Sequence, residues 1–460
     1  MPGRLHLRRQ PEALHPPRRV RGLRCLRTGV PGRGDLLRGR RPRRVGPVHQ
    51  GRSRLLRRPG QPRRGLQGRQ DRQRRPLRGR AARERGVAAM ALRRLHSASP
   101  ARRLPRFPWD RMAPYRERAA AHPGGLVDLT VGAPVDEVPA AIRRALDAAS
   151  AAPGYPTVAG PPELRGAMRS WLHRHTGVGE DVAVLPTVGS KELVANLPFQ
   201  LGIGPGEIVA YPEIAYPTYE IGAILAKAEA LPVADPREAA GSRLRLVWIN
   251  YPTNPTGETA SVDHLRELVR WARESGVVLA SDECYLTLGW DEERPPVSVL
   301  DPRVNDGDLT GLLAAHSLSK RSNLAGYRSA FLAGDPALIA DLLELRRHAG
   351  FMVPWAVQQA TIAALHDESH AIEQRARYER RRTVLRGAVE AAGFRVDHSE
   401  AGLYLWATRG EDCWTTVEAL AERGILAAAG EFYGAKGGRH VRLSLTATDE
   451  AIADAADRLA

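Results

Sequence analysis

Cysteine and long apolar runs are scarce in this chain of 460 residues, and each scarcity excludes a class of protein. The three cysteines, Cys25, Cys284 and Cys413, lie too far apart in the sequence for a disulfide framework or a zinc site, so we expect a reducing compartment and no bound metal. No run of about 18 apolar residues occurs, and the N-terminus lacks the apolar segment of a secretory signal. The composition therefore predicts a cytoplasmic protein without a membrane partner.

The positive charge is confined to the first hundred residues. The whole chain carries a formal net charge of +18, but residues 1–100 hold 30 Arg, no Lys and four acidic residues, whereas residues 101–460 are net negative. Phe, Trp, Tyr and Ile are all missing from these hundred residues. A segment with so little apolar bulk cannot offset the entropy of ordering it. We therefore predict that residues 1–102 form a disordered leader.

Three interpretations of this leader are open. An arm that binds nucleic acid would use the arginines, but no aromatic residues are interleaved with them to stack on bases. An organellar transit peptide would be rich in Ser and amphipathic, which this segment is not. We favour the third interpretation, GC-rich DNA translated out of frame with the true start near Met90, and we expect no nucleic-acid partner.

From Leu104 onward, short apolar runs alternate with helical patterns, which is typical of an α/β fold. Ser261–Ser275 reads as an amphipathic helix with an N-cap at Ser261 and Gly276 after its last turn. Longer helical patterns cover Pro336–Arg347 and Ala356–Ala392. The predicted strands are Leu126–Val131, Val182–Leu185, Glu207–Tyr211, Leu244–Asn250, Val277–Asp282, Leu312–His316, Arg328–Ala333, Gly393–Val396, Gly402–Ala407 and His440–Leu445.

We expect two domains after the leader. Residues 146–340 form a large domain, and residues 341–460 form a smaller α+β domain that is completed by residues 103–145.

Four polar segments follow predicted strands, where open α/β sheets place their ligand sites. Thr187–Glu192 opens a helix with a small turn that suits a phosphate, and Asn250–Gly257 holds amides between prolines. Ser281–Tyr285 places Asp282 at the end of a buried strand, and His316–Arg328 contains Lys320 among hydroxyl groups. Taken one at a time, each segment also fits an ordinary turn or loop.

Lysine is the rarest charged residue, with only Lys191, Lys227, Lys320 and Lys436 in the chain. In a sequence that uses arginine almost everywhere, a retained lysine suggests a need for an amine, because a guanidinium stays protonated and forms no Schiff base. An amine, a carboxylate, a phenol, an amide and a phosphate-binding turn together suit pyridoxal phosphate.

The chain resembles the class I/II aminotransferases, which are fold type I pyridoxal-phosphate enzymes. The motifs N-P-T-G, S-D-E-C-Y, S-L-S-K with a following G-Y-R, and V-R-L-S occur in family order from about Arg103 to the C-terminus. The resemblance implies a large domain with a mostly parallel seven-stranded sheet, a smaller α+β domain, and a homodimer with pyridoxal 5′-phosphate as cofactor.

The resemblance also implies a role for each matching residue. Lys320 would carry the cofactor covalently and move the α-proton, Asp282 would pair with the ring nitrogen, and Tyr285 would hold the ring hydroxyl. The residues implied to surround the cofactor and substrate are Gly189, Ser190, Lys191, Ser317, Ser319 and Arg328 at the phosphate, Tyr216 on the ring, Asn254 at the ring hydroxyl and substrate, Tyr155 from the neighbouring subunit, and Gly132 and Arg442 at the substrate carboxylate.

Within the family, the phrases S-L-S-K-R-S-N-L-A-G-Y-R and S-D-E-C-Y-L-T-L-G-W look most like the succinyldiaminopimelate aminotransferases of actinobacteria. That subgroup implies glutamate and N-succinyl-2-amino-6-ketopimelate as substrates, in lysine biosynthesis, and we consider Arg321 for the distal carboxylate. An aspartate or aromatic aminotransferase and a β-eliminating lyase stay open. So does a DNA-binding regulator with an aminotransferase-like domain, although the leader lacks the apolar periodicity of a folded DNA-binding module.

Overall fold

The computed structural model describes residues 99–460 with the exception of residue 240. The predicted leader lies outside this part of the chain, apart from its last residues, where Pro100–Arg102 form a short 3-10 turn, η1. Among the residues that the structure describes, none of the helices combines the length and the apolar character needed to cross a membrane.

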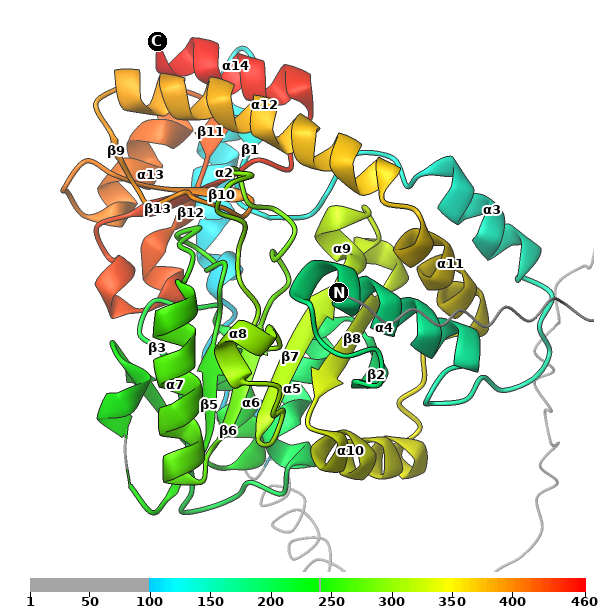
Figure 1. The fold of residues 1–460 in the computed structure, drawn as a ribbon. Helices are drawn as coiled ribbons and strands as arrows, with labels where there is room; N and C mark the ends of the chain where they lie inside the picture. Colours follow the sequence, from blue (N-terminus) through cyan, green and yellow to red (C-terminus); the bar gives the residue numbers. More distant parts are fainter. Residues whose placement is uncertain (1–98, 240) are drawn as a thin grey trace, which may run out of the picture. The chain divides into compact units, whose positions relative to one another are not determined.

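A seven-stranded sheet forms the centre of the larger lobe, with strand order β2-β8-β7-β6-β5-β3-β4 (Figure 1). β8 is antiparallel to both of its neighbours, and all other adjacent pairs are parallel. The strands are β2 (Ala183–Val188), β3 (Ile208–Pro212), β4 (Glu229–Val233), β5 (Leu244–Ile249), β6 (Val278–Asp282), β7 (Leu312–Ser317) and β8 (Ser329–Gly334).

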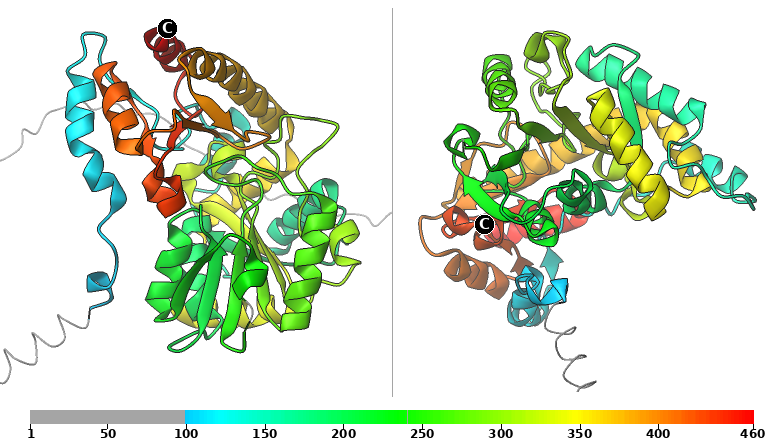
Figure 2. Two further views of the ribbon diagram at one scale, coloured as in Figure 1. Left: turned by 90° about the vertical axis from the view of Figure 1, so that its left-hand side faces the viewer. Right: turned by 90° about the horizontal axis from the view of Figure 1, so that it is seen from below.

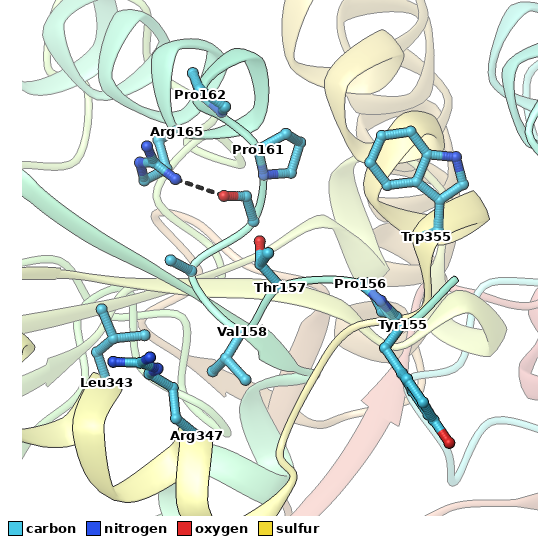
Figure 3. Close-up of a pocket in the computed structure, with 12 residues that line it drawn as sticks. Tyr155, Pro156, Thr157, Val158, Pro161, Pro162, Arg165, Leu343, Arg347 and Trp355 are labelled. Carbon is cyan, nitrogen blue, oxygen red and sulfur yellow. Dashed lines mark hydrogen bonds between the residues drawn. The ribbon is translucent and has the colours of Figure 1, made fainter. Parts of the chain in front are cut away.

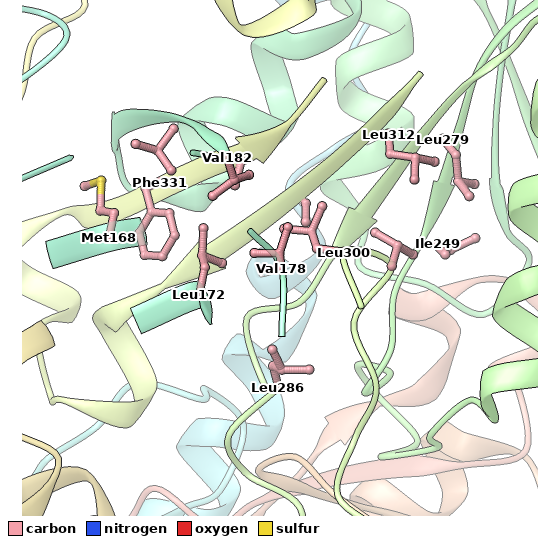
Figure 4. Close-up of a cluster of buried hydrophobic side chains, with 14 of the residues drawn as sticks. Met168, Leu172, Val178, Val182, Ile249, Leu279, Leu286, Leu300, Leu312 and Phe331 are labelled. Atoms are coloured by element: carbon pink, nitrogen blue, oxygen red, sulfur yellow. The ribbon is translucent and has the colours of Figure 1, made fainter. Parts of the chain in front are cut away.

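Helices cover both faces of this sheet, because its strands alternate apolar side chains between two separate core clusters. One face packs against α3 (Ala140–Ala148), α4 (Pro162–Thr176), α7 (Val262–Ser275) and α11 (Trp355–His366), and Figure 4 shows part of that core. The other face packs against α5 (Ser190–Gln200), α6 (Thr218–Ala226) and α10 (Pro336–Ala349). Short helical turns are η3 (Pro236–Ala239), α8 (Pro302–Asn305), α9 (Leu318–Arg321) and η4 (Ala325–Tyr327).

The smaller lobe has a core of its own around a four-stranded antiparallel sheet, with α2 lying beside α13 (Figure 2). A second, two-stranded sheet pairs β1 with β11 in parallel. The elements of this lobe are η2 (Pro108–Met112), α2 (Ala113–Ala120), β1 (Val127–Asp128), α12 (Ser369–Ala391), β9 (Arg395–Asp397), β10 (Tyr404–Thr408), α13 (Cys413–Glu422), β11 (Ile425–Leu426), β12 (Ala428–Ala429), η5 (Gly430–Tyr433), η6 (Ala435–Gly437), β13 (Val441–Ser444) and α14 (Asp449–Leu459).

The predicted fold class is confirmed, including the seven-stranded, mostly parallel sheet. The helix α7 begins and ends as predicted, since the Ser261 hydroxyl accepts from the His264 amide and Gly276 adopts a left-handed conformation. Two details differ. The pattern over 356–392 forms two helices that are interrupted at Asp367 and Glu368, and β4 was not predicted, because Glu229–Val233 lacks a continuous apolar run.

The division into domains stays a prediction, but the packing crosses its proposed limits. Ile142 in α3 lies within 103–145, and Ala360 in α11 lies within 341–460, yet both side chains belong to the core of the large sheet. Helix α11 packs directly on α3 and on α4, so the chain passes from one core to the other in α12 rather than near residue 340.

Candidate active site

Lys320 lies at the carboxyl end of β7, on the short helix α9. The Ser317 hydroxyl caps this helix by accepting from the Ser319 amide at 3.2 Å. The Lys320 amine donates to the carbonyl oxygen of Gly132, and no carboxylate pairs with it among the ion pairs of residues 99–460. Burial lowers the pKa of Lys320, and the positive charges of Arg442 and Arg328 lower it further. The amine is therefore easier to deprotonate than an exposed lysine, as a nucleophile or base requires.

Asp282 ends the neighbouring strand β6 and is almost completely buried. Its carboxylate accepts from the Tyr219 hydroxyl at 3.0 Å and from the Cys284 amide at 3.2 Å, and no cation pairs with it within the described chain. Burial raises the pKa of Asp282, although these hydrogen bonds oppose the shift. A buried carboxylate without a counter-ion costs free energy, so this side chain fits a protonated ring nitrogen of the expected cofactor.

The turn between β2 and α5 has the features of a phosphate site. Gly189 has φ 77°, and a Cβ atom there would overlap the guanidinium of Arg328. The Lys191 amine lies 5.8 Å from the ring centroid of Tyr216. Partial burial and the charge of Arg328 lower the pKa of Lys191, and neither cation has a carboxylate partner among the described ion pairs. Two unpaired cations at the N-terminus of an eleven-residue helix suit a phosphate group.

The loop Asn250–Gly257 is tied to both Asp282 and the smaller lobe. The Asn250 amide donates to the carbonyl oxygens of Asp282 at 2.7 Å and Pro252 at 3.1 Å. The Asn250 side-chain oxygen in turn accepts from the backbone amide of Asn254 at 2.8 Å. The Asn254 side chain is thereby held at a fixed position next to the end of β6.

Arg442, on β13 of the smaller lobe, reaches this same point. Its side chain is 4% exposed and donates to the Asn254 side-chain oxygen at 2.9 Å and to the carbonyl oxygen of Thr130 at 2.7 Å. The guanidinium carbon lies 3.8 Å from the ring centroid of Tyr404 and 4.8 Å from that of Tyr433. No carboxylate of residues 99–460 pairs with it, so this buried cation suits the carboxylate of a small substrate.

Tyr285 and Tyr404 complete the site through a hydrogen bond of 3.1 Å between their hydroxyl groups. Burial raises the pKa of Tyr285. Burial also acts to raise the pKa of Tyr404, but the charges of Arg442 and Lys320 outweigh it and lower that pKa. Tyr404 is therefore the more acidic phenol of the pair.

The structure places the predicted site residues of the large lobe and of β13 around the carboxyl ends of β6 and β7. Two other residues that the sequence suggested, Tyr155 and Arg321, lie apart from this site. Tyr155 is 96% exposed and borders a cavity of about 630 Å³, in which its ring extends away from the other labelled side chains (Figure 3). Arg321 is buried against Trp171 and donates to the Glu368 carboxylate at 2.5 Å. The role considered for Arg321 at the distal carboxylate was therefore wrong.

Tyr219, Tyr404 and Asn250 were missed as site residues. Tyr219 lies in the first turn of α6 and three positions after Tyr216, with 5.9 Å between the two ring centroids, and its ring stacks on Trp248 at 5.1 Å. Asn250 directly follows an apolar strand, which was a usable signal. Tyr404 had no such signal in the sequence, because its contacts depend on how the two lobes meet.

Comparison with known proteins agrees with this geometry. The family model for aminotransferase class I and II matches residues 125–459. A Streptomyces rimosus protein, 4-dedimethylamino-4-oxo-anhydrotetracycline transaminase OxyQ, is 57% identical over 78% of this chain and 99% of its own length. A probable aminotransferase of Mycobacterium tuberculosis is 52% identical over 90% of the chain and 99% of its own length.

More distant relatives extend the comparison. An LL-diaminopimelate aminotransferase of Aquifex aeolicus is 32% identical over 73% of this chain and 90% of its own length. The crystal structure of an aminotransferase from Neisseria meningitidis superimposes with a TM-score of 0.71 at 29% identity, covering 78% of this chain and 98% of that one.

Proposed function

The chain belongs to the class I and II aminotransferases, whose cofactor is pyridoxal 5′-phosphate, and from this premise we propose that it transfers the amino group of glutamate to N-succinyl-2-amino-6-ketopimelate. The observation that carries the transamination of α-amino acids is Arg442, a buried arginine that has no counter-ion among the described residues and lies near the Lys320 amine. The choice of keto acid is supported by the motif resemblance and by relatives named LL-diaminopimelate aminotransferase.

The residues of the site divide the work of holding the cofactor. When bound, pyridoxal phosphate supplies an aldehyde that condenses with amines and a ring that accepts an electron pair from the substrate α-carbon. Lys191, Arg328 and the free amides at the start of α5 would hold its phosphate. Asp282 would keep the ring nitrogen protonated, and Tyr285 with Asn254 would hold the ring hydroxyl.

Lys320 and Arg442 would handle the substrate. Arg442 would bind the α-carboxylate of the substrate through its guanidinium and so orient the α-carbon toward Lys320. The Lys320 amine, with its lowered pKa, would take the proton from the substrate α-carbon as a general base and give it back as a general acid. Tyr216 would pack against the cofactor ring and exclude water from that side.

A second candidate substrate has a specific observation in its favour. The relative OxyQ, at 57% identity, is named for a polycyclic ketone, 4-dedimethylamino-4-oxo-anhydrotetracycline. Glutamate would still be held by Arg442 in such a reaction, while the acceptor would differ.

A coupled assay separates these candidates. Glutamate is offered with N-succinyl-2-amino-6-ketopimelate, oxaloacetate, phenylpyruvate and 4-dedimethylamino-4-oxo-anhydrotetracycline, and 2-oxoglutarate formation is followed. We expect kcat/KM to be highest for the succinylated keto acid by at least about tenfold, which corresponds to about 1.4 kcal/mol. A higher value for the polycyclic ketone would replace the proposed acceptor.

The role of Lys320 is tested in the same assay. We expect Lys320→Ala to lower kcat by at least about 10³-fold, because it removes the proton carrier, and to abolish the visible absorbance of the lysine-bound cofactor. Lys436→Ala, which changes an exposed lysine, is the matched control and keeps both properties. An active, yellow Lys320→Ala protein would contradict the assignment.

A further inference from the structure

The segment from residue 129 to residue 139, here called the strap, crosses the candidate site between β1 and α3. Three successive carbonyl oxygens of the strap accept hydrogen bonds from the body: Thr130 from Arg442 at 2.7 Å, Val131 from the Thr446 hydroxyl at 3.1 Å, and Gly132 from the Lys320 amine. The backbone of the strap therefore contacts both side chains that we assign to the substrate.

The strap is fixed at its first residue, because the Leu129 side chain is buried and its backbone pairs with Leu426 and Ser444. Beyond that point the strap contains no helix or strand, and the side chains of Val131 and Val135 are 48% and 54% exposed. Ordering a segment of this kind costs backbone entropy at every residue, so an anchor near its far end is needed.

Asp136 provides that anchor. Its two carboxylate oxygens accept from the Arg381 guanidinium at 2.7 and 2.8 Å, and one of them also accepts from the Gln374 amide at 2.7 Å. The side chain of Arg381 is only 3% exposed and that of Asp136 11% exposed. Burial would raise the pKa of Asp136, but the bonds from Arg381 and Gln374 outweigh it and lower that pKa. Removing one partner of a bidentate, largely buried pair costs more than removing one partner of an exposed ion pair.

The same face of α12 also contacts the loop that follows Lys320. Gln374, Tyr378 and Arg381 are spaced four and three residues apart, so they share one side of the helix. The Asn323 amide donates to the Gln374 side chain at 3.0 Å and to the carbonyl oxygen of Glu137 in the strap at 3.2 Å. Figure 1 shows α12 running from the smaller lobe toward α3 and α11.

We propose that Asp136, Gln374 and Arg381 are positioning residues that hold the strap over Lys320 and Arg442 before the substrate arrives. The proposal rests on the proposed function only in taking glutamate as a substrate. If the anchor is lost, the free energy of ordering the strap weakens substrate binding, because the strap must then become ordered when the substrate binds. The bound complex itself has the same arrangement as in the wild type. The effect therefore falls on KM, with kcat little changed.

Asp136→Asn tests this in the half-reaction with glutamate, in which the cofactor absorbance changes without any keto acid. Per bound cofactor, we expect the KM for glutamate to rise about tenfold and kcat to stay within about threefold. Asp291→Asn, which breaks an exposed pair with Arg294, is the matched control and leaves both constants unchanged. A role in overall stability alone would lower the melting temperature without this separation of KM from kcat.

Hydrogen exchange of the cofactor-free protein gives a readout that does not depend on activity. We expect peptides covering the strap to exchange faster in Asp136→Asn than in the wild type, while peptides from β5 do not change. If Asp136→Asn does not fold, Gln374→Met keeps the Arg381–Asp136 pair and removes the hydrogen bonds of Gln374 to Asp136 and Asn323, and we expect about a threefold rise in KM. Unchanged KM and unchanged strap exchange in a folded variant overturn the proposal. An incorrect keto acid leaves both measurements intact, so the two failures are distinguishable.

Discussion

Asp282 and Glu283 show how neighbouring residues in one motif serve opposite faces of the sheet. Asp282 faces the candidate site, whereas Glu283, one residue on, is buried on the other face beside His316, with 3.7 Å between the carboxylate and the imidazole nitrogen. The Glu283 carboxylate accepts from the Ser298 hydroxyl at 2.6 Å and the Val299 amide at 2.9 Å. Burial still dominates and raises the pKa of Glu283 to about 7.

This raised pKa predicts a specific dependence of stability on pH. The folded state binds a proton at Glu283 that the unfolded state, with a pKa near 4.5, has already released. The stability that the group contributes is therefore complete below about pH 4.5 and is lost as the pH rises to about 7, by roughly 3 kcal/mol. Glu283→Gln stays neutral and avoids this loss.

We expect the free energy of unfolding of Glu283→Gln, relative to that of the wild type, to be larger at pH 8 than at pH 5, so that the variant gains relative stability at high pH. Comparing the two pH values cancels any cost of the substitution that does not depend on pH. Glu293→Gln, at an exposed position, is the control and shows no such difference. Equal effects at pH 5 and pH 8 in urea unfolding would show that Glu283 titrates normally.

For single residues, the sequence predicted the chemistry of the site better than it predicted which side chains contact each other. Lys320 and Asp282 could be singled out because a rare amine and a carboxylate at the end of an apolar strand are unusual in themselves. The direction of a side chain was harder to predict. Arg321 is adjacent to Lys320 yet points to the opposite side, toward Glu368, because one helical position turns a side chain by about 100°.

Among the elements, the turn from β2 into α5 carries the sharpest sequence requirement. Gly189 combines φ 77° with a close approach to the Arg328 guanidinium, so we expect Gly189→Ala to raise the Kd for pyridoxal phosphate at least about tenfold and to cost about 1–3 kcal/mol of stability. Gly202→Ala is a matched control, since Gly202 also has φ 77° but has open space around its Cβ position.

Cofactor titration followed by absorbance separates the two effects in these glycine variants. Both lose stability through the backbone, and only Gly189→Ala loses affinity for the cofactor. Equal Kd values for the two variants would remove Gly189 from the phosphate site.

Elements were predictable where periodicity and caps agreed, as in α7, and less so where the signal depended on neighbours. The break between α11 and α12 at Asp367 and Glu368 contains neither Gly nor Pro, so the helical pattern ran through it. β4 lies at the edge of the sheet and mixes exposed and half-buried residues, so it lacks the apolar run of the central strands. In both cases tertiary packing decides the structure.

The whole molecule raises a question that one chain does not answer, namely what Tyr155 contacts. Its side chain is 96% exposed beside a cavity lined by Pro156, Val158, Leu343 and Trp355 (Figure 3). The family resemblance assigns this tyrosine to the cofactor phosphate of a second subunit. We therefore predict a homodimer in which this apolar surface is covered and each Tyr155 serves the other subunit's site.

Two measurements test the dimer together. Light scattering should give twice the mass of one chain, and Tyr155→Phe should raise the Kd for pyridoxal phosphate about tenfold, because one hydrogen bond to a charged group is worth about 1.5–3 kcal/mol. Tyr115→Phe is the control, since Tyr115 stacks on Trp414 in the smaller lobe, outside the candidate site. A monomeric protein whose Tyr155→Phe variant binds the cofactor as tightly as the wild type would contradict both the dimer and the role of Tyr155. A dimer with unchanged cofactor affinity would contradict only the role of Tyr155. Tyr155 is 96% exposed in one chain, so a loss of affinity on removing its hydroxyl would support a contribution to the site of a second copy of the chain.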